Sequence, residues 1–339
     1  MSILWHSLAD QVLSGVPATS EQAIAVLRAP DEEILDLLGA AYRLRLAAFG
    51  KTVQLYVLMN IRSGLCPEDC GYCSQSRVSS ADIPKYPLLP DEKILEGAEQ
   101  AARWGACTFC MVASGRSPAD HEVRRIAGIV RSVKSRFPIR ICTCLGILSS
   151  SQAQALADAG VDRVNHNLNT SEQHYPKICS THTFQERVET LGRVRAAGIG
   201  QCSGCIVGMG ESHEDLVWVA ERLKELEVVS IPVNFLHPVD GTPLEGRWDL
   251  TPQFCLKALC MFRFVNPKTE IRIAGGRELH LGSLQPMGLY AANSIFLGDY
   301  LTTPGQAVES DLKMIREMGF EVTPPPVRSS VEPALSAVA

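Results

Sequence analysis

The sequence predicts an α/β protein whose core is a (β/α)8 barrel of the TIM type, preceded by a helical extension. Short apolar runs bounded by Gly, Pro or Asp alternate with amphipathic stretches along most of the 339 residues, which is typical of buried parallel strands joined by helices. The first run leads into a cysteine-rich loop, whereas an open doubly wound sheet would carry a glycine-rich phosphate loop there. The closed barrel is therefore favoured over the open sheet.

The elements can be assigned in order along the chain. Residues 1–50 are expected to form the helical extension, because the acidic segment 31–33 begins an apolar-periodic run and Gly50 ends it. The barrel is expected to cover residues 51–322. Its strands are expected at 53–60, 107–113, 139–145, 163–168, 201–207, 231–236, 270–274 and 293–297. Amphipathic helices are expected at 90–104, 119–136, 149–159, 184–197, 214–226 and 252–265. The Pro-, Ser- and Ala-rich segment 323–339 is predicted to be a mobile tail.

The composition is that of a globular protein with a sizeable core, since 46% of the residues are hydrophobic and 20% are charged. The net charge of −5 argues against a nucleic acid or an anionic membrane as a partner. No apolar run reaches the roughly 18 residues of a membrane span, and no signal-peptide pattern is seen, so we expect a cytoplasmic protein. In that reducing setting, twelve cysteines indicate metal or redox chemistry. Cys107, Cys179, Cys255 and Cys260 have no partner at ligand spacing and are interpreted as packing residues.

Cys66, Cys70 and Cys73 form a C-x3-C-x2-C pattern on the loop after the first predicted strand. Thiolates are soft ligands that suit iron–sulfur clusters or zinc. Structural zinc usually takes four ligands, and no fourth ligand is nearby in the sequence. Three cysteines on a cubane cluster leave one iron open to bind a small molecule. The pattern therefore favours a cluster with an open iron, and a zinc site is the alternative.

Longer strings around these cysteines and further along the chain resemble one known family. They are CPEDCGYCSQS at 66–76, VNHN at 164–167, CSGCIVGMGE at 202–211 and ANSIFLG at 292–298. The cysteine loop is the signature of the radical S-adenosylmethionine superfamily, and the strings together resemble the biotin synthase family within it, over about residues 54–320. The resemblance implies an enzyme that converts dethiobiotin to biotin by inserting sulfur. It also implies a flavodoxin-type or ferredoxin electron donor and a homodimer.

The same resemblance implies two iron–sulfur clusters. The first is a [4Fe–4S] cluster held by Cys66, Cys70 and Cys73, with S-adenosylmethionine at its open iron. The second is a [2Fe–2S] cluster deep in the barrel, from which the sulfur is taken. Its implied ligands are Cys110, Cys142, Cys202 and Arg272.

Strand parity agrees with this second ligand set. The four residues fall on four different predicted strands, and alternate residues of a barrel strand point inward. A core-facing arginine is rare without an anionic partner, which a cluster would provide. Cys144 shares the face of Cys142 and is an alternative ligand. Cys205 lies three residues after Cys202 and faces the other way unless the strand bends at Ser203-Gly204, so the nuclearity of the second cluster stays open.

Polar side chains of the fourth and sixth predicted strands are candidates for binding the substrate. Asn165 and Asn167 share one face of the fourth strand, and two amides inside a barrel need hydrogen-bonding partners. The ureido ring of dethiobiotin offers a carbonyl and N–H groups that match them. The resemblance implies that Asn234 joins them from the sixth strand, and a strand-end cap is an equal alternative. His166 is expected to face away and is interpreted as structural.

Contacts to S-adenosylmethionine are also implied by the resemblance. Asn167 is expected between substrate and cofactor, and Asn169 is expected at the ribose, where the family often has Asp. Arg187 is expected to pair with the methionine carboxylate, and a solvated helix residue is its alternative. Tyr72, directly before the third cysteine of the loop, is a further candidate.

Three alternative functions stay open at this point. Another enzyme of the superfamily, such as a cluster maturase or a mutase, would keep the cysteine loop but need not combine Arg272 with three inward cysteines. The other two are a cluster-bearing sensor or scaffold without enzymatic activity, and a structural zinc protein.

Overall fold

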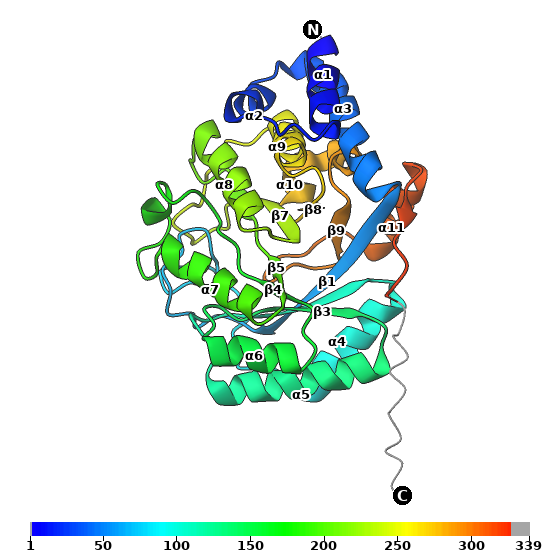
Figure 1. The fold of residues 1–339 in the computed structure, drawn as a ribbon. Helices are drawn as coiled ribbons and strands as arrows, with labels where there is room; N and C mark the ends of the chain where they lie inside the picture. The colour runs from blue at the N-terminus through cyan, green and yellow to red at the C-terminus, as the bar shows by residue number, and fades with distance from the viewer. Residues whose placement is uncertain (1, 327–339) are drawn as a thin grey trace, which may run out of the picture.

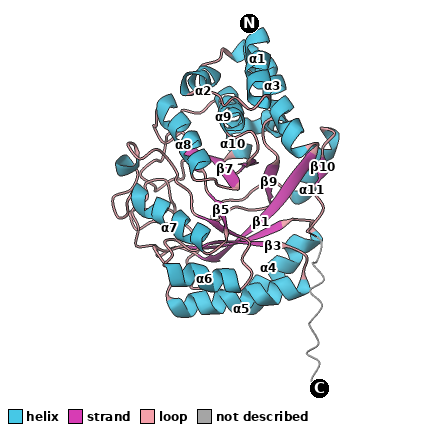
Figure 2. Ribbon diagram, viewed as in Figure 1, coloured by secondary structure: helices cyan, strands magenta, loops and turns pink. Residues whose placement is uncertain are grey.

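A closed barrel of parallel strands forms the centre of the molecule, and helices surround it (Figure 1, Figure 2). The computed structural model describes residues 2–326. Each strand of the ring is parallel to its neighbours, and β9 pairs with β1 to close it, as predicted. The strands are β1 (Thr52–Arg62), β2 (Thr108–Ala113), β3 (Arg140–Cys144), β4 (Arg163–Asn165), β5 (Gly200–Cys202), β6 (Cys205–Val207), β7 (Ser230–Phe235), β8 (Glu270–Ile273) and β9 (Ser294–Leu297).

Successive side chains of each strand alternate between the barrel interior and the surrounding helices. Leu55 and Phe109 belong to the large hydrophobic core between strands and helices. Tyr56, Cys110 and Cys142 form a separate buried cluster on the other face of the same strands. This alternation follows from the period of two in a β-strand, and it fixes which residues line the lumen.

Helices follow most strands, and several of them begin at a residue whose side chain caps the first turn. Ser149, Thr183 and Ser212 each accept a hydrogen bond from a backbone N–H in the first turn of the helix that follows, which satisfies a donor that a helix start leaves unpaired. The helices around the barrel are α4 (Asp91–Arg103), α5 (Asp120–Arg136), α6 (Ser150–Asp158), α7 (Phe184–Ala196), α8 (His213–Glu225), α9 (Pro252–Val265), α10 (Arg277–Leu281) and α11 (Val308–Glu317), with the 3-10 helices η2 (Tyr175–Lys177) and η3 (Gly282–Tyr290). Within residues 2–326, none of the helices is long and apolar enough to cross a membrane.

The predicted N-terminal extension is helical. It consists of α1 (Ser2–Leu13), α2 (Ser20–Leu27), the 3-10 turn η1 (Asp31–Glu33) and α3 (Ile34–Phe49). These helices lie together beside α9, which α2 and α3 contact directly (Figure 1). α3 ends at Gly50, whose φ of +57° suits glycine, and the chain then enters β1.

A short last strand joins the end of the barrel to its beginning. β10 (Glu321–Val322) pairs in parallel with the first residues of β1. Thr323 still donates its N–H to the carbonyl of Val53, at 2.9 Å. The predicted mobile tail at 323–339 therefore starts with a residue attached to the barrel, and its residues 327–339 lie outside the described part of the chain.

The fifth predicted strand differs from the expectation of one run over residues 201–207. It is divided into β5 and β6, which both pair with β7. Gly204 is the reason, because a Cβ at this position would lie 1.9 Å from the carbonyl oxygen of Pro232. Cys205, just after the break, packs in the outer hydrophobic core.

Candidate functional site

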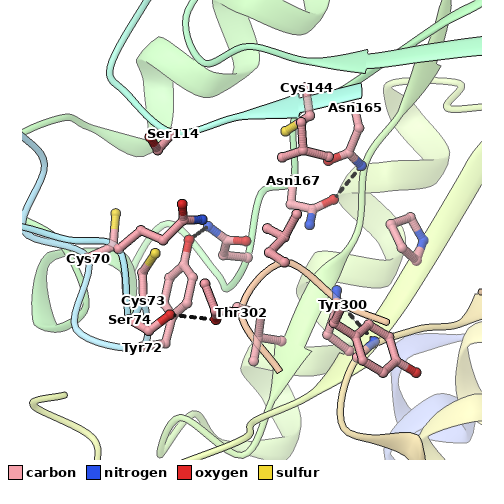
Figure 3. Close-up of a pocket in the computed structure, with 18 of the residues that line it drawn as sticks. Cys70, Tyr72, Cys73, Ser74, Ser114, Cys144, Asn165, Asn167, Tyr300 and Thr302 are labelled. Carbon is pink, nitrogen blue, oxygen red and sulfur yellow. Dashed lines mark hydrogen bonds between the residues drawn. The ribbon is translucent and has the colours of Figure 1, made fainter. Parts of the chain in front are cut away.

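One cavity of about 390 Å³ joins the cysteine loop to the barrel lumen. Figure 3 shows Cys70, Tyr72 and Cys73 of the loop on one side, and side chains of the third and fourth strands on the other. This volume is within the range of small-molecule sites. The predicted site residues that line it are Cys66, Cys70, Tyr72, Cys73, Cys110, Cys142, Cys144, Asn165, Asn167, Asn169, Arg187, Asn234 and Arg272.

The cysteine loop is folded back on itself directly after β1. The N–H of Cys66 bonds to the carbonyl of Gln75 at 3.3 Å, and the N–H of Cys73 bonds to the carbonyl of Cys70 at 3.1 Å. Gln75 also accepts the N–H of Gly64 through its side chain, at 3.0 Å. Burial raises the pKa of Cys73 to about 11, so this thiol is protonated near neutral pH unless a metal replaces the proton.

Cys179, predicted from the sequence to be a packing residue, lies against this loop. Its Sγ is 3.8 Å from Sγ of Cys70 and 3.2 Å from Oδ1 of Asp69. The hydrogen bond with Cys70 lowers the pKa of Cys179. In the sequence, Cys179 and His182 form a C-x2-H pattern, and this spacing could have indicated a polar site at Cys179.

His182 completes this polar group but is not free to bind a metal. A ring nitrogen of His182 lies within 4.8 Å of the sulfurs of Cys70 and Cys179. However, its Nε2 is 2.8 Å from Nη2 of Arg187, which can only donate, and its Nδ1 contacts the carboxylate of Glu68. Both ring nitrogens are therefore engaged, so His182 orients its neighbours.

The four residues expected around the cofactor line the cavity and are joined in two pairs by hydrogen bonds. Asn169 donates its side-chain N–H to the hydroxyl of Tyr72, at 2.7 Å. Arg187 is buried and donates to the carbonyl of Asn167, at 2.8 Å, and to the hydroxyl of Tyr175. Its alternative as a solvated helix residue is therefore wrong.

The four residues expected deep in the barrel are gathered about one point. Cys110 and Cys142 are directly paired on β2 and β3. Hydrogen bonding with Cys110 raises the pKa of Cys142, and hydrogen bonding with Cys142 raises the pKa of Cys202. Nη1 of Arg272 lies 3.8 Å from Sγ of Cys202. Strand parity thus predicted their convergence correctly.

The two additional cysteines of these strands differ in position. Cys144 pairs with Val112, one inward position further along β3 than Cys142, and lines the cavity. Burial raises the pKa of Cys144 to about 11. Cys205 packs in the outer core, where burial also raises its pKa.

Arg272 lies in a buried polar network that was not predicted from the sequence. Its Nη2 donates to Ser230 and to Glu270, both at 2.7 Å. Glu270 also pairs with Arg163, at 2.7 Å. Burial alone would raise the pKa of Glu270, but Arg163 and Arg272 hold it well below its ordinary value. The signal was available, because Glu270 and Arg272 are two residues apart and share one strand face.

The candidate substrate-binding amides lie between the two cysteine groups. Asn165 donates to Oδ1 of Asn167, at 2.9 Å (Figure 3). Nδ2 of Asn165 also lies 3.4 Å from Sγ of Cys202. Asn234 lines the same cavity, but its amide bonds to main-chain groups of β6 and of the loop after β8, as a strand-end cap does. His166, expected to face away, is among the residues that line the cavity, and its buried Nε2 has no hydrogen-bond partner within residues 2–326.

A barrel with three cysteines on the loop after its first strand, open to one cavity, is the architecture of a radical S-adenosylmethionine enzyme. A family model described as the radical SAM superfamily matches residues 60–223. A second, described as the biotin and thiamin synthesis associated domain, matches residues 232–321. The structure resembles a methylornithine synthase (PylB), with a TM-score of 0.82 and 21% identity over 95% of this chain and 97% of that chain. It also resembles the FeFe-hydrogenase maturase HydG from Carboxydothermus hydrogenoformans, with a TM-score of 0.80 and 16% identity over 94% of this chain and 79% of that chain. These two likenesses show the fold alone.

Comparison with curated proteins gives the family. The chain is 58% identical to the biotin synthase of Rhodopirellula baltica, over 94% of this chain and 89% of that protein. It is 54% identical to that of Geobacillus thermodenitrificans, over 94% and 96% of the two chains, and 51% identical to that of Bacillus subtilis strain 168, over 94% and 95%. The chain belongs to the biotin synthase family. Membership implies a [4Fe–4S] cluster with S-adenosylmethionine, and an auxiliary cluster.

Proposed function

We propose that this chain converts dethiobiotin to biotin, with a [4Fe–4S] cluster at the loop cysteines and a [2Fe–2S] cluster in the lumen. The observation that carries the proposal is the single cavity that joins the two cysteine groups, with asparagine side chains between them. Placement is what this chemistry needs from a protein, because radical, substrate and sulfur donor must be in contact and shielded from water. The proposed cluster ligands are Cys66, Cys70 and Cys73, and Cys110, Cys142, Cys202 and Arg272.

The residues present fit both clusters. Three thiols on one short loop match a cubane with an open iron. In the lumen, three thiols converge with a guanidinium whose Nε has no partner among the described residues. An unpaired buried donor is costly, and an anionic cluster against it would satisfy it. When bound, the clusters would supply the electron that cleaves S-adenosylmethionine and the sulfur that closes the thiophane ring.

The protein's own contribution begins with the cofactor. Arg187 brings a permanent positive charge to the cavity wall near Cys70, where it would hold the methionine carboxylate. Tyr72 and Asn169, already bonded to each other, would receive the ribose. Gly208 and Gly210 have φ values of +100° and +92° and shape the nearby turn after β6.

Substrate binding is assigned to the amides inside the barrel. Asn165 and Asn167 would exchange their mutual hydrogen bond for bonds to the ureido ring of dethiobiotin. Asn167 would then stand between substrate and cofactor. Asn234 would contribute one edge of its amide while its main-chain bonds hold it in place. A flavodoxin-type or ferredoxin donor and a homodimeric assembly complete the proposal.

Anaerobic reconstitution followed by a joint assay of biotin and 5′-deoxyadenosine tests this function. Wild-type protein should form both products from dethiobiotin and S-adenosylmethionine under reduction. Cys142→Ala should still form 5′-deoxyadenosine but no biotin, because it alters only the lumen site. Cys144→Ala is the matched control and should retain biotin formation. The reverse result for the two cysteines would contradict the ligand assignment, and 5′-deoxyadenosine without biotin in the wild type would point to another enzyme of the superfamily.

A further inference from the structure

Glu270 is a buried carboxylate under Arg272 that the proposed reaction does not itself use. It is 3% exposed and accepts five hydrogen bonds. Its Oε1 receives Ser230 at 3.0 Å, Ser294 at 3.0 Å and Nη2 of Arg272 at 2.7 Å, while Oε2 receives Tyr56 at 2.9 Å and Arg163 at 2.7 Å. These donors come from β1, β4, β7, β8 and β9, so five strands of the barrel hold the carboxylate.

The contacts of Arg272 leave only one side of its guanidinium group without a protein anchor. Nη2 is anchored by Ser230 and Glu270, and the guanidinium carbon lies 3.3 Å from the centre of the Tyr56 ring and 5.0 Å from that of Phe296. Nη1 is left facing Sγ of Cys202, at 3.8 Å. A guanidinium is a rigid planar fork, so fixing one nitrogen and the plane fixes where the other nitrogens point.

A contribution to stability is a weak explanation for the ion pair between Glu270 and Arg272. Burying a carboxylate and a guanidinium costs desolvation that their attraction often only offsets, and apolar replacements are frequently as stable. Orientation is a better explanation, because outer residues that fix the geometry of a ligand are a general feature of metal sites.

We infer that Glu270 is a positioning residue that aims Nη1 and Nε of Arg272 at the auxiliary cluster. The inference rests on the proposed function, since it takes the lumen site as the place of that cluster. Glu270 also balances the charge of one of the two arginines that it contacts, Arg163 and Arg272, which leaves a single net positive charge beside the three cysteines. It touches neither substrate nor reacting atoms and acts only through Arg272.

The test is Glu270→Gln, reconstituted anaerobically and compared with wild type by absorption and Mössbauer spectroscopy. The amide is neutral and accepts on one side only, so Nη2 of Arg272 loses its charged anchor and the direction of Nη1 and Nε is no longer fixed. We expect the auxiliary-cluster signal to shift or its iron to be lost, and biotin formation to fall about tenfold or more. Formation of 5′-deoxyadenosine should persist, which shows that the barrel is folded and the loop cluster intact. An unchanged auxiliary spectrum would overturn the inference.

Arg163→Gln is the matched control. It breaks the same buried network at Oε2 but leaves Arg272, Ser230 and Ser294 on Oε1. Its unfolding temperature should fall while the auxiliary spectrum stays as in the wild type. Equal spectral shifts in Arg163→Gln and Glu270→Gln would mean that the network is only structural, and would reject a positioning role.

A double variant covers the case in which Glu270→Gln does not fold. Glu270→Gln with Arg163→Gln removes one charge of each sign, so the net charge of the group is kept, and the auxiliary spectrum should still shift. A double variant that cleaves S-adenosylmethionine with an unchanged spectrum would overturn the inference. Absence of a second cluster from the reconstituted wild-type protein would contradict the proposed function. If the wild-type protein has this cluster and Glu270→Gln does not change its spectrum, only the present inference is contradicted.

Discussion

Buried cysteines of this chain stand in very different surroundings. Cys255 and Cys260 are enclosed by the apolar side chains around α9, as a packing role requires. Cys179 is also buried, but its sulfur lies 3.8 Å from that of Cys70. Here Cys70 donates to Cys179, and Cys179 donates to Asp69. Once a cluster replaces the proton of Cys70, the contact between the two sulfurs can persist only if Cys179 becomes the donor, and hydrogen bonds to cluster sulfurs are among the factors that set reduction potentials.

Replacing Cys179 by Ala should therefore make the reduction potential of the loop cluster more negative. Loss of a donor destabilises the more negatively charged reduced state. The potential would be measured by a redox titration followed by electron paramagnetic resonance. Cys255→Ala is the control and should leave the potential unchanged, since Cys255 lies in α9 away from the loop. A potential unaffected by Cys179→Ala would show that the contact has no influence on the cluster.

Among the helices, α5 is tied to the end of β1 by one carboxylate. Glu122 accepts the N–H of Ala119 at 2.9 Å, within the start of the helix, and pairs with Arg62 of β1 at 2.6 Å. Burial alone would raise the pKa of Glu122, but these two contacts lower it. The contact secures the strand end from which the cysteine loop departs.

Glu122→Gln should lower the free energy of unfolding by about 1 kcal/mol at neutral pH. A carboxyl with a lowered folded pKa stabilises above its unfolded value of about 4.3 and loses that effect as the pH falls. The difference between wild type and variant should therefore shrink below about pH 4. Denaturant unfolding at several pH values measures it. Glu92→Gln, at an exposed site in the first turn of α4, is the control and should change the free energy of unfolding little. A stability difference between wild type and Glu122→Gln that does not depend on pH would argue against the ion pair.

The break between β5 and β6 is a second feature of element scale. Gly204 passes so close to Pro232 that no side chain fits, and its N–H reaches Oδ1 of Asn167 at 3.1 Å. The break therefore positions Asn167, a candidate substrate-binding residue. It also directs the side chain of Cys205 away from the lumen and into the outer core.

Gly204→Ala should destabilise the protein by about 2 kcal/mol or more, because the added methyl meets a backbone carbonyl. It should also weaken dethiobiotin binding through Asn167. Thermal unfolding and substrate titration measure the two effects. Gly128→Ala, at an exposed helical site with open space, should instead be neutral or slightly stabilising. Equal stability of Gly204→Ala and wild type would contradict the close approach.

Across the whole molecule, periodicity made the barrel and its lumen predictable. The alternation of eight predicted strands with helices predicted the closed ring. Strand parity predicted that Cys110, Cys142, Cys202 and Arg272 converge inside it. Contacts made by loops without regular secondary structure could not be predicted from periodicity. Cys179 reaches Cys70 through the segment after β4, whose path has no period. The division at Gly204 depends on Pro232 of a strand distant in sequence. Glu270 is the first residue of an otherwise apolar predicted strand, and the strand pattern does not predict which donors surround its carboxylate.

The central claim is that the lumen site donates the sulfur atom of the product. Protein whose auxiliary cluster has been rebuilt with a heavy isotope of sulfide, and then freed of unbound sulfide, tests it in a single turnover. Mass spectrometry of the biotin should find the heavy isotope in the thiophane ring, and Cys142→Ala should yield no labelled product. Unlabelled biotin from the labelled wild-type protein would contradict the account.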